Sequence, residues 1–302
     1  MTVLGQQVPV RNYICSRDGI HYRPAPENAN IRLVLLPTNE CGACCPFCIA
    51  AGTAVPGRMD LSKLERVLTA LKAENALNGI TITGGEPFTD AGYLDELLCM
   101  IYGIMGTRFE VSVTTNGMYL NELHRIRYLS YLDQLHISRH HYRDDINNRL
   151  FGREMPTGDR MRELLTEFAY KDLFVFNCVL LKEGIANADE ACRYMDFAIR
   201  TGAGKTAFQV CSDINAYCGR QRISYAEVLP EDDRRFLFTR SFCDRDACRC
   251  SDGIYFSAAE GGIMEFYGHE RTGNDDGICR ALIMRPDNKL LAGYDGTVLW
   301  EG

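Results

Sequence analysis

Four cysteines lie within eight residues in the stretch Cys41-Gly-Ala-Cys44-Cys45-Pro-Phe47-Cys48. Three of them, Cys41, Cys45 and Cys48, are separated by three and then by two residues. Thiolates are the ligands of iron–sulfur clusters, and short spacings allow one loop to bind several irons. Three cysteines would leave one iron of a four-iron cube open to a small chelating ligand. Cys44 falls outside this spacing, and we assign it no ligand role.

The spacing by itself leaves alternatives open. Zinc sites usually contain two C-x2-C pairs or Cys/His pairs, and no second pair matches here. A redox-active C-x2-C motif would use Cys45 and Cys48 and would not account for Cys41. Phe47 directly precedes the last cysteine, where an aromatic ring could shield a cluster or a bound purine.

A second motif, Gly84-Gly85-Glu86-Pro87, follows the run Gly79–Thr83, which we interpret as a strand. Two glycines allow the backbone to approach a ligand closely, and the Glu86 carboxylate can accept hydrogen bonds from an amine. A glycine pair alone more often marks a turn. The cysteine loop also follows a predicted strand, and ligands bind at the carboxyl ends of parallel strands.

Together the two motifs resemble those of the radical S-adenosylmethionine (SAM) superfamily. In that family a C-x3-C-x-aromatic-C motif holds a [4Fe-4S] cluster, and a Gly-Gly-Glu-Pro strand end binds the SAM amino group. Cys41, Cys45, Phe47 and Cys48 match the first motif, and Gly84 to Pro87 match the second. The resemblance implies that an electron from the cluster cleaves SAM to a 5′-deoxyadenosyl radical, which takes hydrogen from an unactivated carbon.

Strands and helices alternate around these motifs, which predicts an α/β fold with a parallel sheet and helices outside it. The resemblance covers roughly residues 30 to 212 and implies a partial (βα)6 barrel, open on the substrate side. Predicted strands span residues 31–36, 79–83, 109–114, 134–138, 173–181 and 206–211, and predicted helices span about 60–74, 90–101, 120–132, 159–170 and 187–200.

Further strand ends supply candidate SAM contacts. The segment Thr115-Asn116-Gly117 resembles the third-strand end that faces the SAM ribose. Ser138 and Arg139 end the fourth strand, where an arginine fork could clamp the methionine carboxylate; pairing of Arg139 with a surface acid is the alternative. Two amides within apolar strands, Asn177 and Gln209, either point toward SAM or substrate or are buried and bonded to the backbone.

The polar segment from residue 139 to 148 follows the fourth strand, at the edge where barrel enzymes place specificity residues. We therefore expect His140, His141, Tyr142 and Arg143 to contact the substrate or take part in catalysis. Asp144 and Asp145 are expected to cap the helix that follows.

The carboxyl-terminal third has a different pattern. A helix is expected around residues 230–239, and hairpins are expected at residues 253–267 and 281–292. Cysteines on small hairpins suggest a domain stabilised by metal. The pattern resembles the twitch or SPASM extension of some radical SAM enzymes, which binds an auxiliary [4Fe-4S] cluster.

The expected ligands of that auxiliary cluster are Cys243, Cys248, Cys250 and Cys279. Their C-x4-C-x-C spacing with a distant fourth cysteine departs from the usual SPASM pattern. Either Cys211 or Cys218 could therefore replace one of them, and zinc is the alternative metal. The expected domains are an amino-terminal arm (1–30), the radical SAM partial barrel (31–212) and the twitch/SPASM-like domain (213–302).

Composition limits the possible partners. The 302 residues include 46% hydrophobic and 24% charged residues, with a net charge of −7. The absence of a basic tract argues against nucleic acid, and we find no apolar stretch of membrane-spanning length and no signal peptide. Fourteen cysteines in an unsecreted chain favour metal or redox chemistry in a reducing compartment, so we expect a cytoplasmic protein.

We expect the substrate to be a small molecule, tailored by oxidation, epimerisation or cyclisation, with a flavodoxin or ferredoxin as reductant. The segment 180–187 resembles the fifth-strand end of the branch containing the molybdenum-cofactor GTP cyclase. Radical modification of a ribosomally made peptide is an alternative, although the amino-terminal arm is too short for the leader-binding domain of many peptide-modifying relatives. A second alternative is an iron–sulfur electron-transfer protein without SAM chemistry.

Overall fold

The fold is α/β, and its central feature is one mixed sheet. The computed structural model describes residues 1–8, 13–15, 22–24, 31–51, 55–168, 171–228, 230, 233–239, 253–257, 263–267, 279, 281–294 and 296–302. Twelve strands of this part of the chain form the sheet, and two short hairpins lie apart from it: β1 (Thr2–Val3) with β2 (Gln6–Gln7), and β3 (Tyr13–Cys15) with β4 (Tyr22–Pro24).

Six parallel strands form the middle of the sheet in sequence order, as the alternating pattern predicted. They are β5 (Ile31–Leu35), β6 (Leu77–Ile82), β7 (Val111–Thr115), β8 (Gln134–Ser138), β9 (Phe174–Leu180) and β10 (Lys205–Val210). Because all six run the same way, the loops after them meet at one edge of the sheet.

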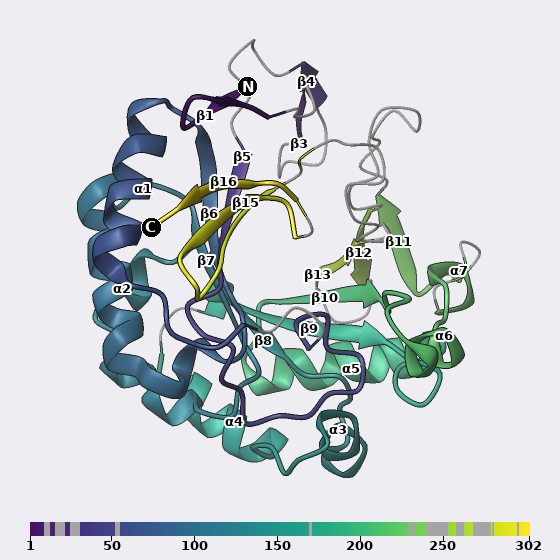
Figure 1. Cartoon of the computed structure of the whole chain (residues 1–302). Helices are drawn as coiled ribbons and strands as arrows, with labels where there is room; N and C mark the ends of the chain where they lie inside the picture. The colour runs from purple at the N-terminus through teal and green to yellow at the C-terminus, as the bar shows by residue number, and fades with distance from the viewer. Residues whose placement is uncertain are drawn as a thin grey trace.

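Helices α1 (Leu61–Ala73), α2 (Ala91–Met105), α4 (Gly158–Thr166) and α5 (Ala188–Thr201) connect the strands and lie along the outside of the sheet (Figure 1). Each begins at a residue whose side chain accepts hydrogen bonds from the free N–H groups of the first turn. These caps are Asp60, Asp90, Thr157 and Asn187. The predicted starts near Asp90 and Asn187 are confirmed.

The two faces of the central strands differ. Alternate residues, such as Leu33, Ile82 and Phe176, are fully buried and join the apolar core shared with the helices. The residues between them face the other way, because side chains alternate along a strand. Many of these are polar and only partly buried, including Thr81, Thr114, His136, Asn177 and Gln209.

The carboxyl-terminal hairpins extend both edges of this sheet instead of forming a sheet of their own. On one edge β13 (Ile263–Tyr267) pairs in parallel with β10 and continues to β12 (Gly253–Ser257) and β11 (Phe236–Thr239). On the other edge β14 (Ala281–Met284) pairs in parallel with β5 and continues to β15 (Lys289–Ala292) and β16 (Val298–Glu301). Both predicted hairpins are therefore confirmed as antiparallel pairs.

Three predictions about elements are wrong. The helix expected over 120–132 is two 3-10 helices, η2 (Leu120–Arg125) and η3 (Leu129–Tyr131), because Ile126 between them is extended. The helix expected over 230–239 is replaced by β11 at residues 236–239. Helix α3 (Asp144–Phe151) is capped by Arg143 without a side-chain bond, so Asp144 and Asp145 lie inside its first turn.

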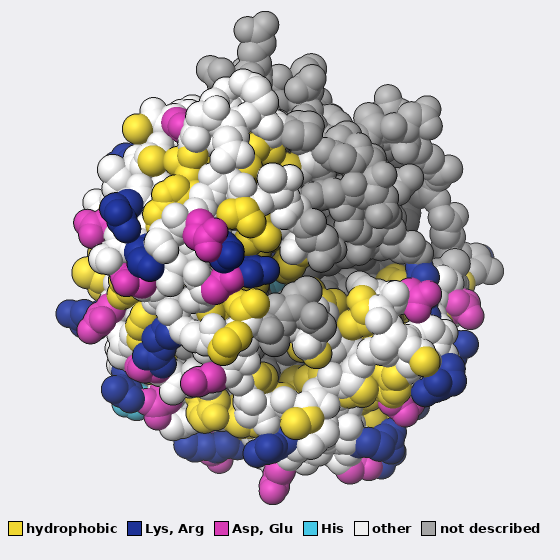
Figure 2. Space-filling model, viewed as in Figure 1, with side chains coloured by type: hydrophobic (Ala, Val, Ile, Leu, Met, Phe, Trp, Pro, Cys, Tyr) yellow, Lys and Arg dark blue, Asp and Glu magenta, His cyan; other side chains and the backbone are white. Residues whose placement is uncertain are grey.

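The remaining short elements are η1 (Pro87–Asp90), η4 (Lys171–Leu173), α6 (Ala216–Gln221) and α7 (Tyr225–Val228). Within the described residues, no helix combines the length and the apolar character needed to cross a lipid bilayer. On the visible face, lysine, arginine and acidic side chains are interspersed around the edge of the molecule (Figure 2).

Candidate functional site

The cysteine loop follows β5, at the carboxyl edge of the parallel strands. Two neighbouring segments hold it. The N–H of Cys44 donates to the Phe151 carbonyl at the end of α3 (2.8 Å), and the Asn215 side chain donates to the Pro46 carbonyl (2.9 Å). Asn215 also caps α6. The loop is therefore fixed from two sides while its cysteine side chains stay available.

Cys41, Cys45 and Cys48 are free thiols, the first exposed and the others half-buried. Burial is the main cause that raises the pKa of Cys45 to about 12, and the neighbouring Cys48 and Cys41 raise it further. Burial likewise raises the pKa of Cys41, with smaller contributions from other groups that include Cys48. Thiols that perturb one another in this way lie close together, so this donor set fits a cluster held by three cysteines.

Across the part of the chain that the structure describes, no three His, Cys, Asp or Glu side chains converge to hold a single metal ion. The thiolates of one tetrahedral zinc lie about 4 Å apart, because each Zn–S bond is about 2.3 Å. The cysteines of a four-iron cube bind different irons and lie further apart.

Phe47 lies beneath the loop and is 8% exposed. Its ring packs edge-on against His140 (centroids 4.8 Å apart) and is stacked with Tyr217 (6.5 Å). Leu150 and Leu181 complete the apolar cluster around it. The ring therefore anchors the loop to the strand ends behind it, and its contact with a bound purine remains a prediction.

The glycine pair after β6 lies directly against the start of the cysteine loop. The N–H of Gly85 donates to the Thr38 carbonyl (2.8 Å), and the N–H of Glu86 donates to the Glu40 carbonyl (2.8 Å). A methyl group at Gly85 would lie 2.2 Å from the Glu40 carbonyl oxygen, and one at Gly84, where φ is +117°, would lie 2.6 Å from the Thr38 oxygen. Only glycine permits this approach.

Glu86 is fully buried, and protein donors contact both of its carboxylate oxygens. It accepts hydrogen bonds from the N–H of Phe88 (3.0 Å), the Thr115 hydroxyl (2.7 Å) and the N–H of Asn116 (2.6 Å). Burial raises the pKa of Glu86 to about 7, although these hydrogen bonds lower it. The carboxylate thus joins the ends of β6 and β7, and a SAM contact at this motif stays a prediction.

Asn116 connects the end of β7 to the cysteine loop. Its side-chain nitrogen lies 3.4 Å from the Cys41 sulfur. Its side-chain oxygen accepts the N–H of Met118 at 2.8 Å. Hydrogen bonds therefore connect the segments that follow β5, β6 and β7 to one another around Cys41.

Arg139 is bonded to the protein itself in this structure, and its role as a clamp for the methionine carboxylate stays a prediction. Its guanidinium is 1% exposed and donates to the carbonyls of His141 (2.9 Å) and Pro156 (3.0 Å) and to the Asp144 carboxylate. The group also lies over the Phe197 ring, 5.0 Å from its centroid. These partners follow β8 or lie at the start of α3, just before α4 and on α5, so the side chain is directed toward the helices.

The predicted substrate-contacting residues that follow Arg139 also contact other residues of the protein. His140 is buried, accepts the Val179 N–H at Nδ1 (3.2 Å) and has its pKa lowered to about 3, mainly by burial. His141 is buried beside Glu190 (3.4 Å), and Tyr142 accepts a long bond from Arg193 (3.5 Å).

Arg143 is exposed and pairs with its own neighbour Asp145 at 2.8 Å. The role of these four residues, His140 to Arg143, in substrate contact or catalysis stays a prediction. His141 and Tyr142 contact Glu190 and Arg193 of α5, whereas His140 packs against Phe47 and Arg143 is exposed.

A polar group that sequence reasoning missed lies on the face without helices. His136 of β8 is bonded through Nδ1 to the Asn177 side-chain oxygen (3.1 Å) and through Nε2 to that of Gln134 (2.9 Å). Ser138 is the register partner of Asn177, and Gln209 is that of Val179. The alternation Gln-Leu-His-Ile-Ser in β8 was the available signal, because it puts His136 on the same face as Ser138.

The predicted auxiliary ligands lie mostly outside the described residues, which include Cys279 but not Cys243, Cys248 or Cys250. Cys279 is 3% exposed, and its thiol contacts the Ala281 carbonyl at 3.3 Å. The possible substitutes Cys211 and Cys218 are both buried in the apolar cluster around Phe47. Burial raises the pKa of Cys211 to about 12, and a hydrogen bond with Cys218 adds to the shift.

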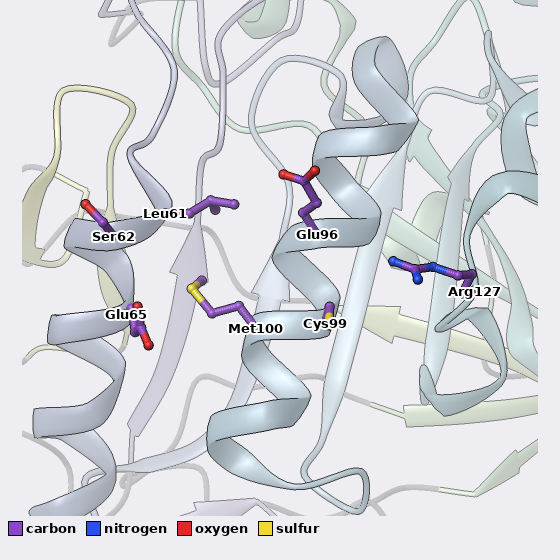
Figure 3. Close-up of a pocket in the computed structure, with 7 residues that line it drawn as sticks. All are labelled: Leu61, Ser62, Glu65, Glu96, Cys99, Met100 and Arg127. Carbon is purple, nitrogen blue, oxygen red and sulfur yellow. The ribbon is translucent and has the colours of Figure 1, made fainter.

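A hollow of about 460 Å³ lies elsewhere, between α1 and α2 on the outer side of the molecule (Figure 3). None of its lining residues is a predicted site residue. The hollow is lined by Leu61, Ser62, Glu65, Glu96, Cys99, Met100 and Arg127.

Comparison with known proteins gives matches of three kinds. Residues 35–193, more than half of the chain, match the family described as the Radical SAM superfamily. A probable GTP 3′,8-cyclase of Thermococcus kodakarensis is 28% identical over 125 residues, which are 41% of this chain and 38% of that protein.

Among solved structures, Streptococcus suis SuiB bound to the precursor peptide SuiA gives a TM-score of 0.57 at 17% identity. That match covers 88% of this chain and 60% of SuiB. SuiB bound to S-adenosylmethionine gives a TM-score of 0.48 at 22% identity, covering 62% of this chain and 40% of SuiB. The chain thus spans less than two thirds of the length of each of these proteins.

Proposed function

The chain belongs to the radical SAM superfamily, and we propose that it takes hydrogen from a small polar molecule by means of a [4Fe-4S] cluster and SAM. Cys41, Cys45 and Cys48 would hold the cluster. The six parallel strands β5 to β10 would form a partial (βα)6 barrel around the substrate. The overall reaction would be a biosynthetic oxidation, epimerisation or cyclisation.

The joining of three strand ends around the cysteine loop supports this proposal most. Gly85 and Glu86 donate their N–H groups to the loop's first residues, and the Asn116 side chain contacts Cys41. If the glycine pair only formed a turn, its backbone would not have to lie in direct contact with the cysteine loop. The arrangement brings the two family motifs to one point of the sheet edge.

When bound, a reduced cluster and SAM supply a 5′-deoxyadenosyl radical, which takes a hydrogen atom from an unactivated carbon. The chain's own residues hold the reactants in place. Phe47 anchors the loop, and the bond from Cys44 to the Phe151 carbonyl and that from Asn215 to the Pro46 carbonyl limit its movement. The backbone around Gly84 and Gly85 would receive the methionine end of SAM.

The polar face of the sheet supports a polar substrate. Thr81, Thr114, His136, Asn177 and Gln209 lie on the face away from the helices. Their hydroxyl, imidazole and amide groups both donate and accept hydrogen bonds. A substrate rich in hydroxyl, amine or carbonyl groups fits such a surface better than an apolar substrate does.

We also propose a twitch/SPASM-like region at residues 213–302 with an auxiliary [4Fe-4S] cluster on Cys243, Cys248, Cys250 and Cys279. The burial of Cys279 at the start of β14 is compatible with a ligand held in an ordered segment. The cluster would accept an electron from the substrate radical. A flavodoxin or ferredoxin would supply the first electron.

A peptide substrate is the second candidate. SuiB, in its complex with the precursor peptide SuiA, resembles this fold over 88% of the chain. Incubation with SAM and either small-metabolite or peptide fractions of a cell extract separates the two. The fraction that raises 5′-deoxyadenosine formation above the substrate-free rate contains the substrate.

The decisive test replaces single cysteines of the loop. Alanine at Cys41, Cys45 or Cys48 should abolish the formation of 5′-deoxyadenosine from SAM under reducing, anaerobic conditions. Alanine at Cys44, which is exposed in the same loop, is the matched control and should leave it intact. Full activity in the Cys41, Cys45 and Cys48 variants would overturn the proposal. Failure of the wild type to bind SAM would favour a simple electron-transfer protein.

A further inference from the structure

Asn116 is held from two sides, by the Glu86 carboxylate that follows the neighbouring strand β6 and by the backbone of its own turn. Its N–H donates to the Glu86 carboxylate at 2.6 Å. Its side-chain oxygen accepts the N–H of Met118 at 2.8 Å. The first bond holds the backbone of Asn116 against the residue that follows β6, and the second holds its side chain within the turn after β7, so the side chain has a defined position.

The bond from Met118 also settles which way the amide group faces. A backbone N–H can only donate, so the atom of the Asn116 amide that meets it must be the oxygen. The NH2 group is then the part that faces the Cys41 sulfur, at 3.4 Å. Sulfur accepts such hydrogen bonds, most strongly as a thiolate.

The packing around this contact is tight on the side of the cysteine loop. A methyl group at Gly42 would lie 2.5 Å from the Met118 sulfur and 3.4 Å from the Tyr119 hydroxyl. The turn after β7 therefore packs directly against the residue that follows Cys41. Movement of Asn116 away from Cys41 would require both segments to rearrange.

We propose that Asn116 is a positioning residue that raises the reduction potential of the cluster through an N–H···S bond to Cys41. This inference rests on the proposed function, because it needs a cluster on Cys41. Reduction adds negative charge, part of which resides on the sulfur ligands, and an N–H dipole aimed at one sulfur stabilises the reduced form. Hydrogen bonds to sulfur are among the factors that set such potentials.

This role differs from the contact with the SAM ribose that the sequence suggested for Asn116. A ribose contact changes the affinity for SAM and has no effect on a cluster without SAM. A bond to Cys41 changes the potential of the cluster whether or not SAM is present. The potential measured without SAM therefore separates the two roles.

The test uses Asn116→Ser in the full chain, with both clusters reconstituted anaerobically. Serine keeps an oxygen that can accept the Met118 N–H, as in an ST turn, but is too short to reach Cys41. Asn121→Ser is the matched control, because Asn121 is exposed and its side chain donates to Glu122. Electron paramagnetic resonance follows the reduced cluster at Cys41 during a redox titration without SAM.

We expect Asn116→Ser to keep the iron and sulfide content of the wild type and to reduce at a lower potential. An approximately tenfold loss in the reduction equilibrium corresponds to about 59 mV for one electron. Asn121→Ser should match the wild type. Equal potentials in all three proteins would overturn the inference.

Asn116→Thr provides a second neutral turn residue if the serine variant does not fold. It carries the same expectation, so an unchanged potential in it would also reject the role of Asn116. Failure of the proposed function has a different result. If the proposed function is wrong, the wild type shows no paramagnetic resonance signal that depends on Cys41. If only the role of Asn116 is wrong, the wild type shows this signal, and Asn116→Ser shows it at the same potential.

Discussion

The N–H of Asn116 donates to the buried carboxylate of Glu86 at 2.6 Å, which joins the ends of β7 and β6. Two further donors, from Phe88 and Thr115, meet the same carboxylate. These three bonds favour the charged form, but the loss of water around the group outweighs them and raises the pKa of Glu86 to about 7. A structural carboxylate at this position therefore makes stability depend on pH.

The sign of the Glu86 contribution follows from proton binding. Between the ordinary value of 4.5 and the folded pKa of about 7, the folded protein holds the proton and the unfolded chain has lost it. The free energy of unfolding therefore falls as pH rises through this range, by roughly 3 kcal/mol at most. Glu86→Gln should remove this fall, measured by urea denaturation between pH 4.5 and 8.

Exposed Glu65, on α1, supplies the control for that measurement. Glu65→Gln makes the same chemical change at an exposed position and should leave the fall in unfolding free energy between pH 4.5 and 7 in place. A Glu86→Gln profile that coincides with the wild-type profile would show that the buried carboxyl makes no contribution to the pH dependence.

His140 should make the opposite contribution. Burial lowers its pKa from 6.5 to about 3, so between these values the unfolded chain holds a proton that the folded protein lacks. The free energy of unfolding therefore rises with pH from about 3 to 6.5, by an amount of the order of 4 kcal/mol. His140→Asn keeps an acceptor for the Val179 N–H and should remove this rise.

The two contributions overlap between pH 4.5 and 6.5 and partly cancel in the wild type. Denaturation at pH 5 and pH 6.5 should therefore separate the two variants. Glu86→Gln should become more stable with rising pH, relative to the wild type, and His140→Asn less stable. Shifts of the same sign in both variants would contradict the assignment. His124→Asn, in the 3-10 helix η2, is the control for the histidine change.

Much of the scaffold was predictable because it depends on local pattern. Strand β8 was predicted residue for residue at 134–138, since its apolar residues alternate with polar ones. The helix start at Asp90 followed from its capping side chain, and the start at Asn187 was also placed correctly. The cysteine loop was recognised from the spacing of Cys41, Cys45 and Cys48 together with the glycine motif at residues 84–87, because both motifs are short and local.

Features that depend on contacts between distant residues were not predictable in this way. Nothing near residues 263–267 or 281–284 indicates that these strands join β10 and β5, because pairing with a distant strand has no local signature. Arg139 was expected to face SAM because it ends a strand. Its direction is instead set by carbonyls at His141 and Pro156, and the second of these, 17 residues away in sequence, is brought near only by folding.

The close approach at Gly85 predicts a strong effect of one methyl group. Gly85→Ala would place that group 2.2 Å from the Glu40 carbonyl oxygen, so the cysteine loop has to move. We expect a loss of roughly 1–3 kcal/mol in unfolding free energy and a lower iron content after reconstitution. Thermal unfolding and iron analysis measure the two effects.

Gly103 is the matched control for this change. It lies within helix α2, and nothing lies within 4 Å of the position that a methyl group would occupy. Gly103→Ala should therefore stabilise the protein by up to about 1 kcal/mol, because alanine is the better helix former. Equal effects of the two substitutions would contradict a specific contact between Gly85 and the cysteine loop.

The buried guanidinium of Arg139 predicts that stability and SAM affinity respond separately to its replacement. Arg139→Lys keeps the charge but cannot maintain the fork of bonds to the His141 and Pro156 carbonyls and the Asp144 carboxylate. The unfolding free energy should fall by roughly 2–4 kcal/mol. The dissociation constant for SAM should stay within about twofold of the wild type, because the side chain faces the helical layer.

Arg143→Lys is the control, since Arg143 is exposed and its pair with Asp145 is an ordinary surface contact. Its effect on stability should stay below about 0.5 kcal/mol. Equilibrium SAM binding at low temperature, where both variants are folded, completes the comparison. Weaker SAM binding by Arg139→Lys with unchanged stability would restore the methionine-carboxylate clamp that the sequence suggested, and would mean that Arg139 turns toward the cysteine loop when SAM binds.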